Sequence, residues 1–174
     1  MNPDQIDPVN RMPHLQAVRK ESMRIGYLSL DAAGRTGADN PMTKLKVRQA
    51  IWYAIDRKAI AGKLVTGGSR VPLAPCIPSQ FGCDGDIAAT YDYNPAKAKQ
   101  LLAEAGYPDG FDVELASYVL PQWGSAVQNY LHAVGICAKL NQFQVAALIQ
   151  RAKAGELRAY LGSWGSYSIN DVSA

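Results

Sequence analysis

The feature that most constrains the fold is an alternation of strand-like and helix-like segments after residue 110. Residues 111–115 alternate between apolar and polar side chains, as a strand with one buried face does. Residues 123–134 carry apolar side chains at helical spacing, and the two patterns return in 136–140 and 145–154. A third strand is predicted at 157–161. Strands connected by single helices form a largely parallel sheet with helices on both faces, so we predict a three-layer α/β fold.

The residues before this alternation divide into an arm and an ordered region. Residues 1–23 contain several prolines and no periodicity, which predicts an irregular arm. Residues 24–30 alternate as a strand, and a helix is predicted over 41–55. Asp56 follows that helix and is placed to cap a second one with its carboxylate.

Helix boundaries on either side of a long loop are also predicted by the sequence. The paired glycines Gly67 and Gly68 are expected to end the second helix. Residues 69–93 are rich in proline and glycine and are interpreted as a loop. Asn94 followed by Pro95 is a strong start for the next helix, because Asn caps well and proline suits the first helical position.

Two of the three cysteines lie within the long loop. A disulfide between Cys76 and Cys83 would close a short loop, and the sequence leaves this bond open. Zinc binding is the alternative use of neighbouring cysteines. It is not favoured, because the spacing is not CxxC and the two histidines, His14 and His132, lie far away in the sequence.

Residues that could carry catalysis are scarce. The sequence contains no phosphate loop, dinucleotide fingerprint, metalloprotease helix or nucleophile elbow. We interpret His132, on the predicted helix 123–134, as a residue held by a neighbour, and Cys137 as a small core residue in an apolar run. This composition favours binding over acid–base or covalent catalysis, and we expect no enzyme activity, cofactor or metal.

Charge and hydropathy argue against two classes of partner. The chain has 18 basic and 15 acidic residues, a net charge of +3, and these are scattered rather than gathered into a basic stripe for nucleic acid. No stretch approaches the ~20 apolar residues of a membrane-spanning helix. Residues 1–5 lack the basic and apolar regions of a signal peptide, so none is expected within this chain.

The expected ligand cleft lies where strands end. Ligands of open α/β sheets bind beyond the carboxyl ends of the strands, which here are Ser117–Tyr118 and a loop predicted at 163–168. Trp164 has two interpretations, because an aromatic side chain at the end of an inner strand is either core or a platform for ligand. Tyr118 is placed to line the same cleft. The candidate ligand-binding residues are Trp164, Gly165, Ser166, Tyr167 and Tyr118.

Three stretches of the sequence are similar, in order and spacing, to motifs of one protein family. Residues 47–60, VRQAIWYAIDRKAI, closely resemble the signature VRQA-x-x-YAIDR-x-x-I, and residues 91–107 resemble YDYDPEKAKQLLAEAGY. The dipeptide Gly110–Phe111 matches the GF that follows. These motifs resemble those of family 5 extracellular solute-binding proteins, the receptor components of peptide, opine and nickel ABC importers.

The resemblance implies a fold, a function and a location. Family members are much longer than this chain and have two lobes that enclose a solute, so residues 24–174 resemble one C-terminal-type lobe of the periplasmic binding protein type II kind, truncated at its C-terminal end. The implied function is binding of peptides or similar small solutes for an ABC permease of the inner membrane. The implied location is the outer face of the cytoplasmic membrane.

The resemblance also predicts limits on what this lobe binds. Peptide-binding relatives carry an acid three positions beyond the tryptophan, where it pairs with the terminal amine of the ligand, but this chain has Tyr167 there. Asp171 is close by in the sequence and is a candidate substitute, although nothing in the spacing requires it. One lobe alone is expected to bind weakly and to self-associate through uncovered apolar surface. The alternative is a self-contained α/β enzyme or regulatory ligand-sensing module, with an acid, base or nucleophile facing the loop at 163–168.

Overall fold

A computed structural model describes residues 5–18, 24–65, 69–74, 76, 80–84 and 91–165. The strands are β1 (Arg24–Leu30), β2 (Phe111–Ser117), β3 (Ile136–Gln142) and β4 (Ala159–Gly165). The helices are α1 (Ile6–Asn10), the 3-10 helix η2 (Pro41–Thr43), α2 (Leu45–Ala54), α3 (Arg57–Lys63), α4 (Pro95–Glu104), α5 (Pro121–His132) and α6 (Val145–Ala154). The segment predicted as an irregular arm therefore contains one short helix, α1.

The four strands form one mixed sheet in the order β1-β4-β2-β3. Strand β2 pairs in parallel with both β3 and β4, which confirms the largely parallel sheet predicted from the alternation after residue 110. Strand β1 pairs antiparallel with β4, so that Ile25 lies opposite Trp164 and Leu30 opposite Ala159. Neither this strand order nor the antiparallel pairing of β1 with β4 was predicted.

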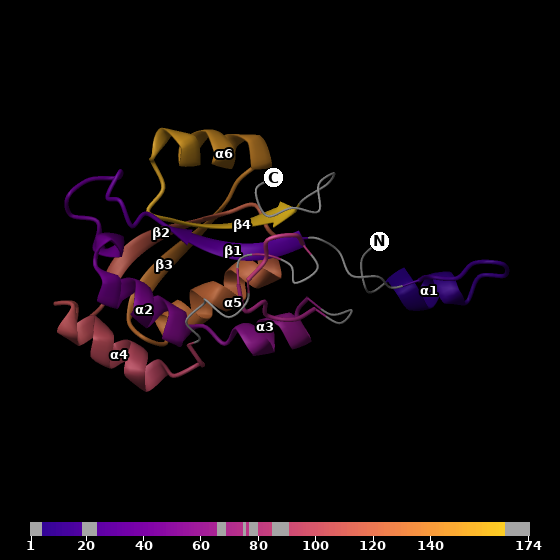
Figure 1. Ribbon diagram of the computed structural model, residues 1–174, viewed down its shortest axis with the longest axis horizontal. Coiled ribbons are helices and arrows are strands. Elements are labelled where there is room, and N and C mark those ends of the chain that lie inside the picture. Colours follow the sequence, from indigo (N-terminus) through magenta and orange to yellow (C-terminus); the bar gives the residue numbers. More distant parts are fainter. Residues whose placement is uncertain are drawn as a thin grey trace.

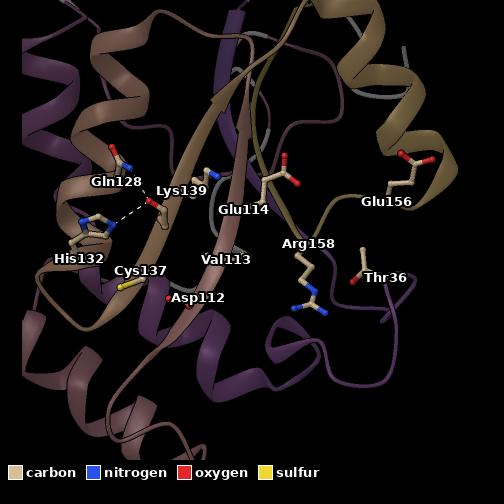
Figure 2. A pocket seen from close by; sticks show the side chains of 11 residues that line it. Thr36, Asp112, Val113, Glu114, Gln128, His132, Cys137, Lys139, Glu156 and Arg158 are labelled. Atoms are coloured by element: carbon tan, nitrogen blue, oxygen red, sulfur yellow. Dashed lines mark hydrogen bonds between the residues drawn. The ribbon is translucent and has the colours of Figure 1, made fainter.

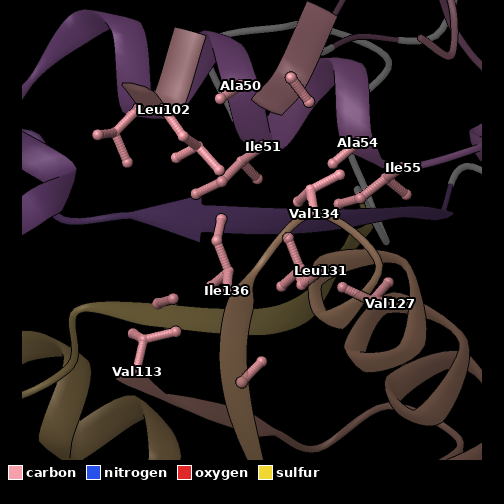
Figure 3. Packing of buried hydrophobic residues seen from close by; sticks show 14 of the residues in the cluster. Ala50, Ile51, Ala54, Ile55, Leu102, Val113, Val127, Leu131, Val134 and Ile136 are labelled. Atoms are coloured by element: carbon pink, nitrogen blue, oxygen red, sulfur yellow. The ribbon is translucent and has the colours of Figure 1, made fainter. Parts of the chain in front are cut away.

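Helices cover both faces of the sheet, which gives the predicted three layers. Helices α2, α4 and α5 lie on one face and α6 lies on the other (Figure 1). The larger apolar cluster fills the space between the sheet and the first group, with Ile51 of α2 and Leu102 of α4 facing Ile136 of β3 (Figure 3). A smaller cluster of Ala116, Leu148 and Leu157 lies under α6. We call the first side the core face and the second the α6 face.

Two side-chain caps start helices where the sequence predicts them. The Asp56 carboxylate accepts a hydrogen bond from the backbone N–H of Ala59 at 2.9 Å and begins α3. The Asn94 side chain accepts from the N–H of Lys97 at 2.9 Å and begins α4. Both caps satisfy amide groups that have no partner within the first turn. Helix α3 ends at Lys63, and the glycines expected to end it, Gly67 and Gly68, lie outside the described residues.

The first of the three motifs is structural. Val47 and Ala50 of α2 are fully buried in the larger apolar cluster. The Arg48 guanidinium turns back and donates to the carbonyls of Met42 and Thr43, at 2.8 and 2.9 Å. The motif therefore fixes α2 against the preceding 3-10 helix.

A close backbone approach explains the glycine of the GF dipeptide. Gly110 has a φ of +79°, and a Cβ atom built there would lie 1.8 Å from the carbonyl oxygen of Gly135. Only glycine allows the backbone just before β2 to pass this close to the backbone just before β3.

The cysteines differ in part from their predicted roles. Cys76 and Cys83 form a disulfide, which closes a short loop. Cys137 is exposed, so its prediction as a small core residue is wrong. The reason is strand alternation, since Ile136 and Ala138 point into the core and Cys137 between them points to the opposite face.

The last strand is longer and later than predicted. The sequence predicts a strand at 157–161 followed by a loop, whereas β4 spans Ala159–Gly165. Glycines at 162 and 165 weaken the local strand pattern, but pairing with β1 extends the strand to its end, with Arg24 opposite Gly165. Trp164 and Gly165 thus lie in a strand rather than in a loop.

Candidate functional site

The predicted cleft residues that the structure describes lie at the carboxyl ends of two neighbouring parallel strands. Tyr118 directly follows β2, and Trp164 and Gly165 are the last two residues of β4. Ser166 and Tyr167 lie outside the described residues, and so does Asp171. The structure therefore brings Tyr118 close to β4, and contact between these residues and a solute stays a prediction.

Trp164 is half-buried and points to the α6 face. Side chains alternate along a strand, so Trp164 shares a face with Gly162 and Tyr160, while Leu161 between them points into the core. Tyr160 packs with the smaller apolar cluster on this face. Trp164 thus lies at the open end of the α6 face, where it retains exposed surface.

The Tyr118 hydroxyl is bound to the backbone of β4. It donates to the carbonyl oxygen of Ser163 at 2.6 Å and accepts from the N–H of the same residue at 2.7 Å. The backbone N–H of Tyr118 also points to the carbonyl of Leu161, at 3.5 Å. The end of β2 is therefore joined to β4 through both the backbone and the side chain of Tyr118.

Three tyrosines from different elements meet around Gly162. The rings of Tyr27 and Tyr160 lie edge to face, with centroids 6.0 Å apart. A Cβ atom at Gly162 would lie 3.0 Å from the Tyr27 hydroxyl and 3.1 Å from the Tyr118 hydroxyl. We call Tyr27, Tyr118 and Tyr160 the tyrosine cluster. Any side chain at position 162 would displace two of its members.

The chemistry of the cluster suits binding more than catalysis. Burial raises the pKa of the Tyr27 hydroxyl above its usual range, and the neighbouring Tyr160 and Tyr118 raise it further. Tyr27 is therefore a neutral phenol at physiological pH. Neutral hydroxyls and ring faces offer hydrogen bonds and stacking, but the cluster contains neither a carboxylate nor an activated nucleophile.

Sequence reasoning found Tyr118 but missed the other two members of the cluster. Tyr27 lies on β1, and its approach to β4 depends on an antiparallel pairing between segments more than a hundred residues apart in sequence. Tyr160 is the second residue of β4, before the predicted cleft. No local pattern in the sequence distinguishes these two tyrosines from ordinary strand residues.

A hollow of about 760 Å³, which we call the polar hollow, lies on the α6 face, toward the amino ends of β2 and β3 (Figure 2). Acidic, basic and sulfur-containing side chains line it, among them Asp112, Glu114, Cys137, Lys139 and Arg158. No group of three or more potential metal-ligating side chains occurs among the described residues. The hollow lies away from the carboxyl ends of the strands, where the ligand site was predicted.

His132 has a structural partner at the rim of this hollow. Its Nε2 lies 3.0 Å from the carbonyl oxygen of Ala138, and Gln128 donates to the same oxygen at 2.8 Å (Figure 2). Strand β3 is an edge of the sheet, so no further strand can hydrogen-bond to this carbonyl, and the two side chains bind it instead. The interpretation of His132 as a residue held by a neighbour is confirmed.

Glu114, which lines the hollow, also forms an ion pair that fastens α6 to the sheet. Arg151 of α6 lies 3.3 Å from a carboxylate oxygen of Glu114, and Asn141 donates to the same oxygen at 3.0 Å. The hydrogen bond from Asn141, together with the bond and the charge of Arg151, lowers the pKa of Glu114 despite partial burial. Glu114 is thus held as an anion by structural partners.

Comparisons with known proteins agree on one family. The family model for bacterial extracellular solute-binding proteins, family 5 middle region, matches residues 1–174. The chain is 29% identical over 168 residues to heme-binding protein A of Haemophilus influenzae, covering 87% of this chain and 28% of that protein. It is 29% identical over 173 residues to the dipeptide-binding protein of Escherichia coli, covering 94% of this chain and 31% of that protein.

A solved structure shows the same fold. The periplasmic binding protein DppA of Helicobacter pylori, in complex with the peptide STSA, superposes with a TM-score of 0.83 and 25% identity. The match covers 98% of this chain and 32% of that protein. The chain therefore spans less than a third of the length of each of these relatives. None of the helices in the described part of the chain has the length and apolar character needed to cross a bilayer.

Proposed function

Because the chain belongs to the family 5 bacterial extracellular solute-binding proteins, we propose that it forms most of one lobe of a receptor for peptides or similar small solutes. The observation that carries the proposal is the superposition of nearly the whole chain on about a third of a peptide-bound periplasmic protein. On this proposal residues 24–174 are a C-terminal-type lobe that continues beyond this chain, preceded by an arm over residues 1–23. A second lobe supplies the opposite wall of the site.

The proposed mechanism is closure of two lobes on a solute. Each lobe contributes part of the contacts, and the solute stabilises the closed state because only that state offers both sets. In this chain the wall consists of Trp164, Gly165, Ser166, Tyr167 and Tyr118. An aromatic ring and backbone groups hold the solute here, and the acid that would pair with a terminal amine is replaced by Tyr167.

The proposed partner and location follow the family. The loaded receptor delivers its solute to an ABC permease, and the protein works outside the cytoplasmic membrane. Two observations support this location: the solved relative from Helicobacter pylori is described as an ABC transporter-associated periplasmic protein, and the Cys76–Cys83 disulfide suits an oxidising compartment.

The isolated lobe is proposed to self-associate. Several large apolar side chains are exposed, among them Phe81 at 78%, Leu73 at 65% and Trp52 at 47%. Such side chains favour association when they are contiguous or when a covering partner is missing. Light scattering of residues 1–174 across a concentration series is expected to show a rising mean mass, and a constant monomer mass would contradict this.

Calorimetry with two forms of the protein tests the proposed function. The complete product of the gene that encodes this chain is titrated with a mixture of di- and tripeptides, and residues 1–174 are titrated in parallel. Saturable binding by the complete protein, with weak or undetectable binding by residues 1–174, is expected because one lobe offers only part of the contacts. Absence of binding by the complete protein, or tight binding by residues 1–174 alone, would overturn the proposal.

A further inference from the structure

Strand β4 continues past the point where its parallel neighbour ends. Strand β2 ends at Ser117, and its last register partner in β4 is Leu161. The chain then turns into α5, which begins at Pro121, whereas β4 runs on to Gly165. Ser163 therefore lies beyond the end of the ladder between β2 and β4. A continued parallel ladder would have offered its N–H and carbonyl a strand partner.

The Tyr118 side chain replaces that missing strand. Its hydroxyl accepts from the N–H of Ser163 at 2.7 Å and donates to the carbonyl of Ser163 at 2.6 Å, so one oxygen atom satisfies both groups. Both bonds are within the range of good hydrogen bonds. We propose that Tyr118 is a positioning residue, whose hydroxyl anchors the end of β4 and thereby sets the position of Trp164 in the solute site.

The anchor acts on Trp164 through the backbone. Ser163 precedes Trp164, and its carbonyl belongs to the peptide unit that joins the two residues. On the other side of β4, Trp164 is paired with Ile25 of β1. The end of β4 is thus held by a strand on one side and by a side chain on the other, and without the hydroxyl only the edge strand β1 would hold it.

The geometry separates this role from hydrogen-bond donation to the solute. A phenolic hydroxyl has one proton to donate, and that proton is committed to the Ser163 carbonyl. Tyr118 therefore serves the solute through Trp164 rather than as a hydrogen-bond donor. Gly162 is part of the same arrangement, because a Cβ there would lie 3.1 Å from the Tyr118 hydroxyl. The inference rests on the proposed function, since it assigns Tyr118 a role in that same site.

Amide hydrogen exchange on residues 1–174 tests the anchor without any ligand. Tyr118→Phe keeps the ring and removes the hydroxyl, so the Ser163 amide is expected to exchange about five- to tenfold faster. The amide of Phe143, which donates to the Ser117 carbonyl at 2.8 Å, serves as an internal reference and should not change. Tyr107→Phe is the matched control, because Tyr107 packs against Phe111 at the opposite end of β2. It should leave the Ser163 amide protected.

Peptide binding by the complete protein tests the consequence for the site. For a di- or tripeptide bound by the unaltered protein, Tyr118→Phe is expected to raise the Kd about fivefold, mainly through faster dissociation, while Tyr107→Phe leaves it unchanged. The urea midpoint of unfolding is measured alongside. If Tyr118 had a merely structural role, its substitution would lower the urea midpoint and the exchange protection of all β2 and β4 amides together. The proposed role predicts faster exchange at the Ser163 amide and faster peptide dissociation.

The outcomes distinguish this inference from the proposed function. Faster exchange at Ser163 together with weaker peptide binding supports the inference. Unchanged exchange at Ser163, or unchanged peptide affinity, in Tyr118→Phe overturns it while leaving the proposed function intact. Failure of the unaltered complete protein to bind any peptide overturns the proposed function itself, and with it the role of Tyr118 toward a solute.

Discussion

The two faces of the sheet are covered by different kinds of contact. On the core face, Leu115 and Ile136 are fully buried against three helices, and Leu102 of α4 is 1% exposed. On the α6 face a single helix covers a small cluster around Leu148, and the remaining surface includes the polar hollow. The core face therefore holds most of the buried apolar surface of the described residues, while much of the α6 face remains in contact with water.

Because the apolar cluster under α6 is small, polar contacts also hold this helix against the sheet. The Arg35 guanidinium donates to the carbonyls of Ala152 and Lys153 at the C-terminal end of α6, at 3.4 and 2.6 Å. Arg151 pairs with Glu114 of β2. One face is thus held mainly by apolar packing and the other by hydrogen bonds and charge. The candidate solute site lies on the second face, at the carboxyl ends of the strands.

The largest expected effect comes from the core face. Leu115→Ala should lower the free energy of unfolding by about 3–5 kcal/mol, because it leaves a cavity among helices that cannot collapse to fill it. Urea denaturation measures the change. Leu45→Ala, at a position 60% exposed on α2, is the control and should change stability by less than about 0.5 kcal/mol. Equal effects of the two substitutions would contradict the assignment of the core.

A smaller effect is expected at the end of α6. Gly155 ends this helix with a φ of +77°, and a Cβ there would lie 2.9 Å from Nε of Arg35. Gly155→Ala should cost about 1–2 kcal/mol through the left-handed conformation alone, with partial loss of the Arg35 contacts. Gly62→Ala in α3, where a Cβ would meet nothing within 4 Å, should instead stabilise by up to about 1 kcal/mol. Thermal unfolding of both variants would reveal opposite shifts in Tm.

The smallest expected effect is a pH dependence on the α6 face. The pKa of Glu114 is lowered in the folded protein, so its contribution is present above the ordinary carboxyl pKa of about 4.3 and is lost as the pH falls through the lower folded value. The contribution should be below about 1 kcal/mol, since the side chain is 37% exposed. Urea unfolding across this acidic range measures it. Glu114→Gln should flatten the acid-side decline slightly, and an unchanged pH profile would contradict the role given to the pair with Arg151.

The sequence predicted the elements whose boundaries have local causes. Strand β1 and helix α6 have the predicted bounds, and α6 ends because Gly155 adopts a left-handed conformation. Helix α3 begins at the cap of Asp56 as predicted. Strand β4 was misplaced because its extent depends on β1, whose partner residues are more than a hundred positions away. Local patterns specify caps and periodicity, but they carry no information on such pairing.

For the candidate site, the sequence predicted residues near strand ends but not the contacts among their side chains. Trp164 and Tyr118 were predicted to lie near strand ends, and the parallel pairing of β2 with β4 brings them to the same edge of the sheet, while their contact with a solute stays a prediction. The hydrogen bonds of Tyr118 to Ser163, and the approach of Tyr27 and Tyr160 to Gly162, depend on side-chain positions across three elements. Their partners are specified only once the sheet is assembled.

By itself, the sequence determined the three layers, the parallel orientation of the last three strands and the family. Periodicity, capping residues and motif spacing depend only on residues that are close in the sequence, so they can be recognised without the tertiary structure. The tertiary structure decided that Cys137 faces solvent, that Cys76 is bonded to Cys83 and that Tyr118 holds the end of β4. Each of these depends on which face a side chain points to and on what lies opposite, and only the packed sheet determines both.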